Sequence, residues 1–133
     1  MDALLRQQVR ERTGDRCEYC RLRQRYDLFH AFHVEHIIAR QHGGADDFEN
    51  LAWACHQCNL HKGTNLAGLD PDTGEMVRLF HPRRDRWEDH YAWDGAKLAG
   101  LTAIGRTTAW LLEMNAPERV ELRRLLMALG ERD

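Results

Sequence analysis

The sequence predicts an α+β fold in which cysteine thiolates hold a short β-hairpin and a helix together around a metal ion. Three observations predict it. The four cysteines form two Cys-x-x-C pairs, a stretch of alternating β-branched residues lies between the pairs, and apolar residues recur with helical spacing near both ends of the chain. With 133 residues, the chain is expected to form one domain, residues 1–133.

Composition and charge favour a globular protein. Hydrophobic residues make up 43% and charged residues 30% of the chain, and no apolar run reaches the roughly 18 residues that span a bilayer. The first residues lack a secretory pattern, so we expect a cytoplasmic location and no membrane partner. The net charge of −2 does not favour nucleic-acid binding, but arginines cluster between Arg6 and Arg25 and again in residues 81–86.

The cysteines are the most specific signal. They are Cys17, Cys20, Cys55 and Cys58, with none left over. Because no secretory pattern is visible, we do not expect disulfides. Two such pairs instead suit a tetrahedral structural zinc site. The 34 residues between the pairs exceed the usual spacing of a zinc finger, which indicates an inserted element. Redox-active or buried free cysteines are the alternative.

Each predicted element follows from a local pattern. Residues 2–13 form an amphipathic helix that stops at Gly14, and residues 32–38 alternate as a strand. A loop rich in turn-forming residues covers 40–47, a second short strand covers 50–54, and a helix runs from about 55 to 65. We expect a turn at 70–74 between short strands, irregular β structure over 75–95, a strand at 98–101, and helices over 102–114 and 117–129.

The motifs between and after the cysteine pairs occur in a defined order. Glu35-His36 comes first, then Gly43-Gly44, then Asn50-Leu51, and finally Cys55-His56-Gln57-Cys58-Asn59-Leu60-His61-Lys62-Gly63. This order resembles the HNH endonuclease family, in particular small bacterial or phage-type members with a four-cysteine zinc site. The resemblance implies a ββα-metal hairpin with flanking helices (core about 17–66, β and helical extension about 67–133). It also implies a DNA-cutting phosphodiester hydrolase. Residues 70–101 resemble a bacterial subgroup of the same family.

The resemblance also implies site residues. His36 is the general base, Asn50 holds the hairpin loop through backbone hydrogen bonds, and Glu35 and Asn59 bind one catalytic Mg²⁺ or Mn²⁺. Imidazole can accept a proton near neutral pH, and oxygen donors suit these ions. Neighbours on a strand point to opposite faces, so Glu35 and His36 share a site only if the strand is twisted or the ion lies at its edge. His61 is the alternative to Asn59. About 200° of helix rotation separates the two residues, so only one of them can face the ion.

Four basic residues are predicted to contact nucleic acid: Arg40, Lys62, Arg83 and Arg84. Glu35 stands where the family often has Asp, and Ala39 where it often has Pro, which leaves the metal preference open.

Two other hypotheses stay open. One is a non-catalytic, zinc-containing module that binds nucleic acid or a protein. The other is a nuclease that docks onto a larger restriction or defence assembly, or onto a second copy of itself, through an apolar helix stripe. Helix patterning favours the alternative that this stripe packs against the core. Its members are Leu122, Leu125, Leu126 and Leu129.

Overall fold

The structure is a computed structural model that describes residues 2–131 and has a mixed α/β fold. The chain divides into two compact units. The N-terminal unit comprises the described residues up to Leu66 together with His81–Asp85, and the C-terminal unit comprises Ala67–Phe80 and the described residues from Arg86 onward. The predicted core motif, about 17–66, lies in the N-terminal unit.

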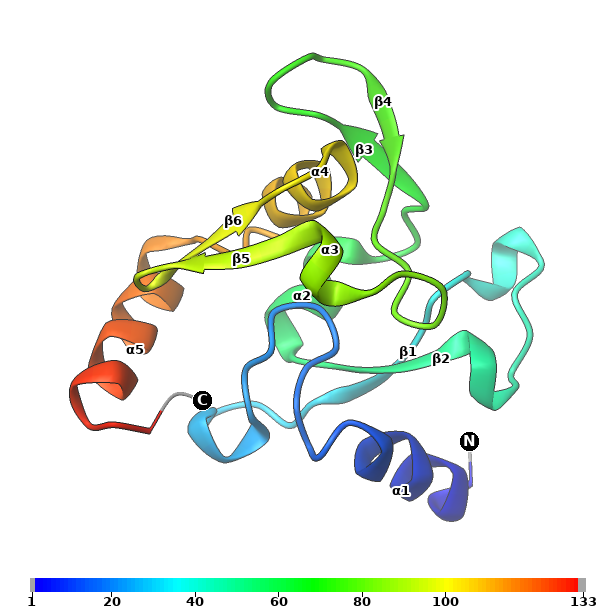
Figure 1. Cartoon of the computed structure of the whole chain (residues 1–133). Coiled ribbons are helices and arrows are strands. Elements are labelled where there is room, and N and C mark those ends of the chain that lie inside the picture. The colour runs from blue at the N-terminus through cyan, green and yellow to red at the C-terminus, as the bar shows by residue number, and fades with distance from the viewer. Residues whose placement is uncertain (1, 132–133) are drawn as a thin grey trace. The chain divides into compact units, whose positions relative to one another are not determined.

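The N-terminal unit begins with helix α1 (Ala3–Arg12), which ends in the turn before Gly14 (Figure 1). The Asp2 carboxylate accepts a hydrogen bond from the Leu5 backbone N–H at 2.7 Å, which satisfies one of the free donors of the first turn. Val9, on the apolar face of α1, is fully buried. The helix therefore follows from both its cap and its apolar spacing.

A hairpin and a helix form the centre of this unit. Strands β1 (His33–His36) and β2 (Leu51–Ala54) pair antiparallel, with Glu35 opposite Ala52. Helix α2 (His56–Lys62) starts two residues after β2, with Cys55 as its N-cap. All four residues of β2 are buried, whereas β1 has one buried residue, Glu35. The predicted order of strand, strand and helix is present, each element shorter than predicted.

The C-terminal unit contains two further hairpins and the remaining helices. Strand β3 (Ala67–Leu69) pairs with β4 (Met76–Arg78) around the predicted turn, and β5 (Tyr91–Asp94) pairs with β6 (Lys97–Gly100). Helix α4 (Ala103–Leu111) contacts β3, β4 and β6, and α5 (Pro117–Ala128) follows it. Pro117 occupies the first turn of α5, as predicted.

One local prediction is wrong. Within residues 75–95, expected to be irregular β structure, Trp87–His90 forms the short helix α3. The Trp87 ring is buried and lies against Tyr91, with ring centroids 5.1 Å apart. A single helical turn is too short to produce the apolar periodicity that identifies a helix in sequence.

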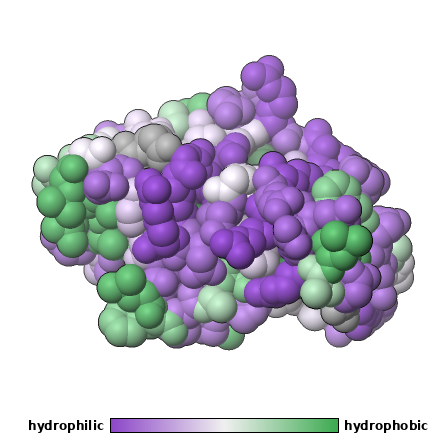
Figure 2. Space-filling model, turned by 90° about the horizontal axis from the view of Figure 1, so that it is seen from below, coloured by the Kyte–Doolittle hydropathy of each residue, from purple (hydrophilic) through white to green (hydrophobic). Residues whose placement is uncertain are grey.

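The predicted apolar stripe is divided between buried and exposed positions. Leu126 is buried and Leu122 is half-buried, but Leu125 and Leu129 expose about 57% and 64% of their surface. On the molecular face in Figure 2, hydrophilic residues predominate and hydrophobic residues form separate spots. Within residues 2–131, none of the helices has the length and hydropathy of a membrane-spanning segment.

Candidate functional site

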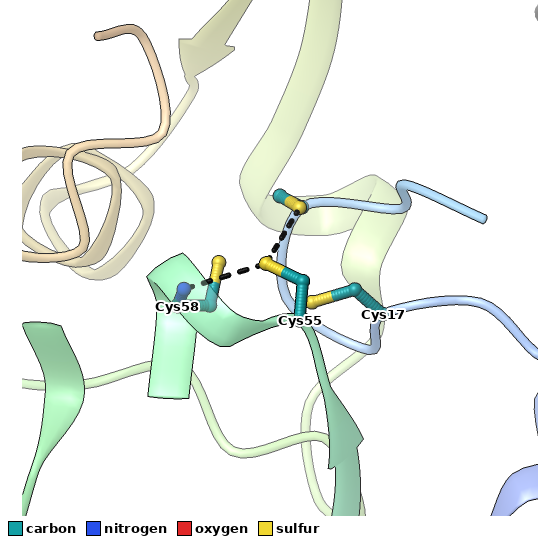
Figure 3. Close-up of side chains that lie close together, drawn as sticks. Cys17, Cys55 and Cys58 are labelled. Carbon is teal, nitrogen blue, oxygen red and sulfur yellow. Dashed lines mark hydrogen bonds between the residues drawn. The ribbon is translucent and has the colours of Figure 1, made fainter. Parts of the chain in front are cut away.

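The four cysteines form one buried cluster. Their sulfur atoms all lie within 4.8 Å of one another, and each thiol is buried. Figure 3 shows the side chains of Cys17, Cys55 and Cys58 turned toward a common point. Cys20 Sγ lies 3.7 Å from Cys55 Sγ, close to the edge of about 3.8 Å that a tetrahedron with Zn–S bonds of about 2.3 Å has. The cluster could hold a metal ion such as zinc.

The local chemistry of the cluster also suits a metal ion. Burial, together with the neighbouring thiols, raises the pKa of the Cys17 thiol well above its usual range, so four bare thiolates there would be unstable. A divalent cation stabilises the thiolates, which are the form that binds zinc. The Cys58 backbone N–H donates to Cys55 Sγ at 3.3 Å, so the start of α2 is part of the site.

The Glu35 carboxylate has an environment that the sequence did not predict. It is 4% exposed, Tyr19 Oη donates to its Oε2 at 2.9 Å, and the Lys62 ammonium forms an ion pair with its Oε1. Burial raises the pKa of Glu35, while Lys62 and Tyr19 act in the opposite direction by stabilising the carboxylate. Both oxygens have protein partners, so this arrangement does not fit the predicted role of Glu35 as a ligand of a catalytic ion.

Lys62 requires a second correction. The side chain is 2% exposed, and its ammonium donates to Ile37 O at 2.9 Å and His36 O at 3.3 Å besides pairing with Glu35. A phosphate cannot reach a lysine whose three donors are used inside the protein. Lys62 instead joins α2 to the end of β1. Nothing in the spacing Asn59-Leu60-His61-Lys62 reveals that this lysine points inward.

His36 lies on the opposite face of β1 from Glu35, as the alternation of a strand requires. Its Nε2 lies 2.7 Å from Asp46 Oδ1, and the same oxygen accepts from Arg40 Nε at 2.8 Å. About 18% of the His36 side chain is exposed, against 62% for Asp46. His36 Nδ1 makes no hydrogen bond to any residue between 2 and 131, so one ring nitrogen is held and the other is available.

Asn50 holds the loop that carries Asp46. Its Oδ1 accepts from Ile38 N at 3.0 Å, and its Nδ2 donates to Ile38 O at 2.9 Å and to Ala45 O at 2.8 Å. Its own backbone oxygen accepts from Ile37 N at 2.8 Å. These contacts hold the end of β1 directly after His36, and the role that the resemblance implies for Asn50 stays a prediction.

The two glycines of the loop serve different purposes. Gly43 has a φ of +87°, which glycine adopts readily, and ends the 3₁₀ turn Arg40–His42. Gly44 is needed for close approach, because a Cβ there would lie 1.7 Å from Ile38 O and 2.9 Å from Asn50 Nδ2. The Gly-Gly pair is therefore part of the same contact between the loop and Asn50.

The remaining predicted residues have mixed environments. Asn59 and His61, the alternatives for ion binding on α2, are both half-buried, and the Asn59 side chain makes no hydrogen bond among the described residues. Arg84 is exposed, as expected for a nucleic-acid contact, and so is Arg40, although Arg40 is paired with Asp46. These two arginines stay predicted contacts.

Arg83 is mainly internal. Its guanidinium forms an ion pair with the buried Glu18, whose other oxygen accepts from Trp53 N at 2.7 Å. Burial lowers the pKa of Arg83 to about 10, with the nearby Arg12 acting in the same direction, so the side chain stays charged at neutral pH. About 14% of the Arg83 side chain is exposed, which does not suit a phosphate contact. A basic run in sequence does not reveal which of its members has an internal acidic partner.

Comparison with known families agrees with this geometry. Residues 17–65 match the HNH endonuclease family, which confirms the resemblance inferred from the motifs. The matched segment contains the cysteine cluster, β1, β2 and α2, and it indicates a domain with nuclease activity on nucleic acid, for which DNA is the implied substrate. No curated protein and no solved structure matches the chain significantly.

Proposed function

We propose that the protein is a DNA endonuclease that hydrolyses phosphodiester bonds, with His36 as the general base and with a requirement for Mg²⁺ or Mn²⁺. The observation that carries this proposal is the state of the His36 ring. One nitrogen is held by Asp46 at 2.7 Å and the other is available, inside the segment that matches the HNH family.

The chain's own groups support the following mechanism. A carboxylate can only accept a hydrogen bond, so His36 Nε2 carries a proton and donates to Asp46 Oδ1. The lone pair of the neutral imidazole therefore lies on Nδ1. Nδ1 can then take a proton from a water molecule that attacks the phosphorus opposite the 3′ oxygen. The bond from phosphorus to the 3′ oxygen breaks, and this oxygen takes a proton from solvent. The family typically leaves a 5′-phosphate and a 3′-hydroxyl. Asn50 keeps the base in place through Ile38 and Ala45.

The zinc and the catalytic ion have separate roles in this proposal. Cys17, Cys20, Cys55 and Cys58 would hold a structural zinc. When bound, a divalent ion stabilises the charge that develops on the phosphate and the leaving oxygen. The Asn59 amide is an accessible oxygen donor, but Glu35 is held by Lys62 and Tyr19, so we assign no reaction step to a Glu35–Asn59 ion site.

A non-catalytic, zinc-containing binding module is the second candidate. The observation that favours it is the Glu35–Lys62 ion pair, because a buried carboxylate that pairs with a lysine does not bind a catalytic ion and so does not contribute to hydrolysis. This candidate predicts DNA or protein binding without cleavage.

A plasmid-nicking assay separates the two. Wild type, His36→Ala and the matched control His42→Ala, an exposed loop histidine, are compared with Mg²⁺, Mn²⁺ and EDTA. We expect ion-dependent nicking by wild type and His42→Ala, and a loss of at least roughly 10²-fold in His36→Ala, as for removal of a general base. Equal nicking by all three proteins would exclude His36 as the base. DNA binding without nicking under any ion would favour the binding module.

A further inference from the structure

Asp46 lies in the loop between β1 and β2, and its carboxylate oxygen Oδ1 contacts both His36 Nε2 at 2.7 Å and Arg40 Nε at 2.8 Å. No motif in the sequence distinguishes Asp46 from the other turn-forming residues around it. Its position ten residues after His36 becomes significant only when the hairpin brings the two side chains together.

We propose that Asp46 is a positioning residue that holds His36 in the tautomer with the proton on Nε2, which leaves Nδ1 as the proton acceptor. This inference rests on the proposed role of His36 as a general base. It extends that role by naming the atom that accepts the proton and the residue that selects this atom.

The charge on Asp46 supports this assignment. The hydrogen bond from Arg40, and then the one from His36, lower the pKa of Asp46, so its carboxyl group is ionised at neutral pH. An ionised carboxylate has only acceptor atoms, and therefore the imidazole nitrogen facing it must be the donor. In active sites, the hydrogen bond at one ring nitrogen selects the tautomer and so the chemistry at the other.

The backbone on both sides of Asp46 is anchored. Ala45 O accepts from Asn50 Nδ2 at 2.8 Å, and Asp47 O accepts from Asn50 N at 3.0 Å. Asp46 is therefore presented from a fixed segment, with Asn50 bound on both of its flanks. A fixed carboxylate can orient a ring, which a mobile surface side chain cannot do.

The alternative is that Asp46 merely forms a surface ion pair with Arg40. Both side chains are more than 60% exposed, and exposed ion pairs of this kind contribute little to stability. The two possibilities therefore differ in where the effect of a substitution appears. A positioning residue changes the state of His36 and the turnover, while the denaturant midpoint stays nearly constant.

The experiment compares wild type, Asp46→Ala and the control Asp72→Ala. Asp72 is a matched control, because it is 67% exposed and also pairs with an arginine, Arg106, at 3.2 Å. The ¹⁵N shifts of the His36 ring, assigned with His36→Gln, are recorded at about pH 9, where an imidazole is neutral. Turnover and KM are measured for the nicking of supercoiled plasmid, and the denaturant midpoint is measured for each variant.

We expect the Nε2–H tautomer in wild type and Asp72→Ala and a tautomer mixture in Asp46→Ala. We also expect the turnover of Asp46→Ala to fall roughly 10- to 100-fold, the usual effect of removing such a partner, with KM and the denaturant midpoint little changed. An unchanged tautomer or unchanged turnover in Asp46→Ala overturns the inference. A wild type that cuts no DNA overturns the proposed function, whereas the ring spectra report the effect of Asp46 on His36 independently of activity.

Discussion

Tyr19 Oη donates a 2.9 Å hydrogen bond to Glu35 Oε2, and both side chains are buried. Tyr19 lies between Cys17 and Cys20, and Glu35 directly precedes His36. The segment that supplies half of the cysteine cluster therefore contacts the strand that carries the candidate base. This hydrogen bond joins the first cysteine pair to β1.

Removal of zinc is expected to unfold the N-terminal unit. We expect about one zinc per chain in wild type and loss of zinc in Cys58→Ser, measured by elemental analysis. Apparent zinc-binding energies of about 10–16 kcal/mol in zinc-finger peptides match or exceed the about 5–15 kcal/mol that stabilise a whole domain. Chelation should therefore abolish hydrogen-exchange protection in β1 and β2. Unchanged protection after zinc is stripped would contradict a structural role for the ion.

The Glu35–Lys62 pair should behave as a coupled unit. Lys62→Met leaves the buried carboxylate without its counter-ion, and such a break typically costs about 3–5 kcal/mol of unfolding free energy. The double variant Glu35→Gln/Lys62→Met should recover a large part of this loss, because neither charge remains. Urea unfolding of the two single variants and the double variant measures the coupling energy. Additive single effects would exclude a direct pair.

Loss of the Asn50 side chain should loosen the loop that holds Asp46. Asn50→Ala removes three hydrogen bonds, each with a net value of about 1 kcal/mol, so we expect about 2–3 kcal/mol less unfolding free energy and a parallel loss of nicking. Asn65→Ala, an exposed asparagine after α2, is the control. If the denaturant midpoints of the two variants coincide, the contacts of Asn50 do not hold the loop.

Acid should destabilise the C-terminal unit through Asp70. Hydrogen bonds from Arg106, at 2.8 Å and 3.2 Å, and from the Asp72 backbone N–H lower the pKa of this buried carboxyl. A carboxyl pKa that is lower in the folded state contributes stability above its unfolded value of about 3.9, and this contribution is lost as the pH falls through the folded pKa.

Asp70→Asn should therefore be less stable than wild type near neutral pH and should lose less stability below about pH 4. Unfolding free energies between about pH 6 and pH 2 test this, with the exposed Asp94→Asn as the control. Parallel pH profiles for wild type and Asp70→Asn would contradict the linkage.

The sequence predicted the elements whose signals are local. Alternation identified β1, apolar spacing identified α1, α4 and α5, and paired cysteines identified the four-cysteine cluster. Asn50 was predicted from its place in the motif, and its side chain hydrogen-bonds to backbone atoms of Ile38 and Ala45, which are close to it in sequence. These features depend on residues close in sequence or on a complete set of ligands.

The direction in which charged side chains point could not be predicted. The sequence predicted Lys62 and Arg83 as phosphate contacts. In the structure, Lys62 pairs with the buried Glu35 and Arg83 with the buried Glu18, each from a distant segment. Asp46 was missed for the converse reason, since an aspartate beside Gly-Gly is an ordinary turn residue until a hairpin register places it against His36. Long-range charge pairing requires knowledge of the packing.

The ion pair between Glu18 and Arg83 has a consequence for dividing the chain. The chain leaves the N-terminal unit after Leu66, returns to it for His81–Asp85 and leaves it again. A fragment ending at residue 66 would contain every residue of the family match and every cysteine, but it would leave a buried carboxylate without its guanidinium. We therefore expect that the segment matching the HNH family does not fold as an autonomous module, and that transplanting it into another protein would also require the five-residue return segment.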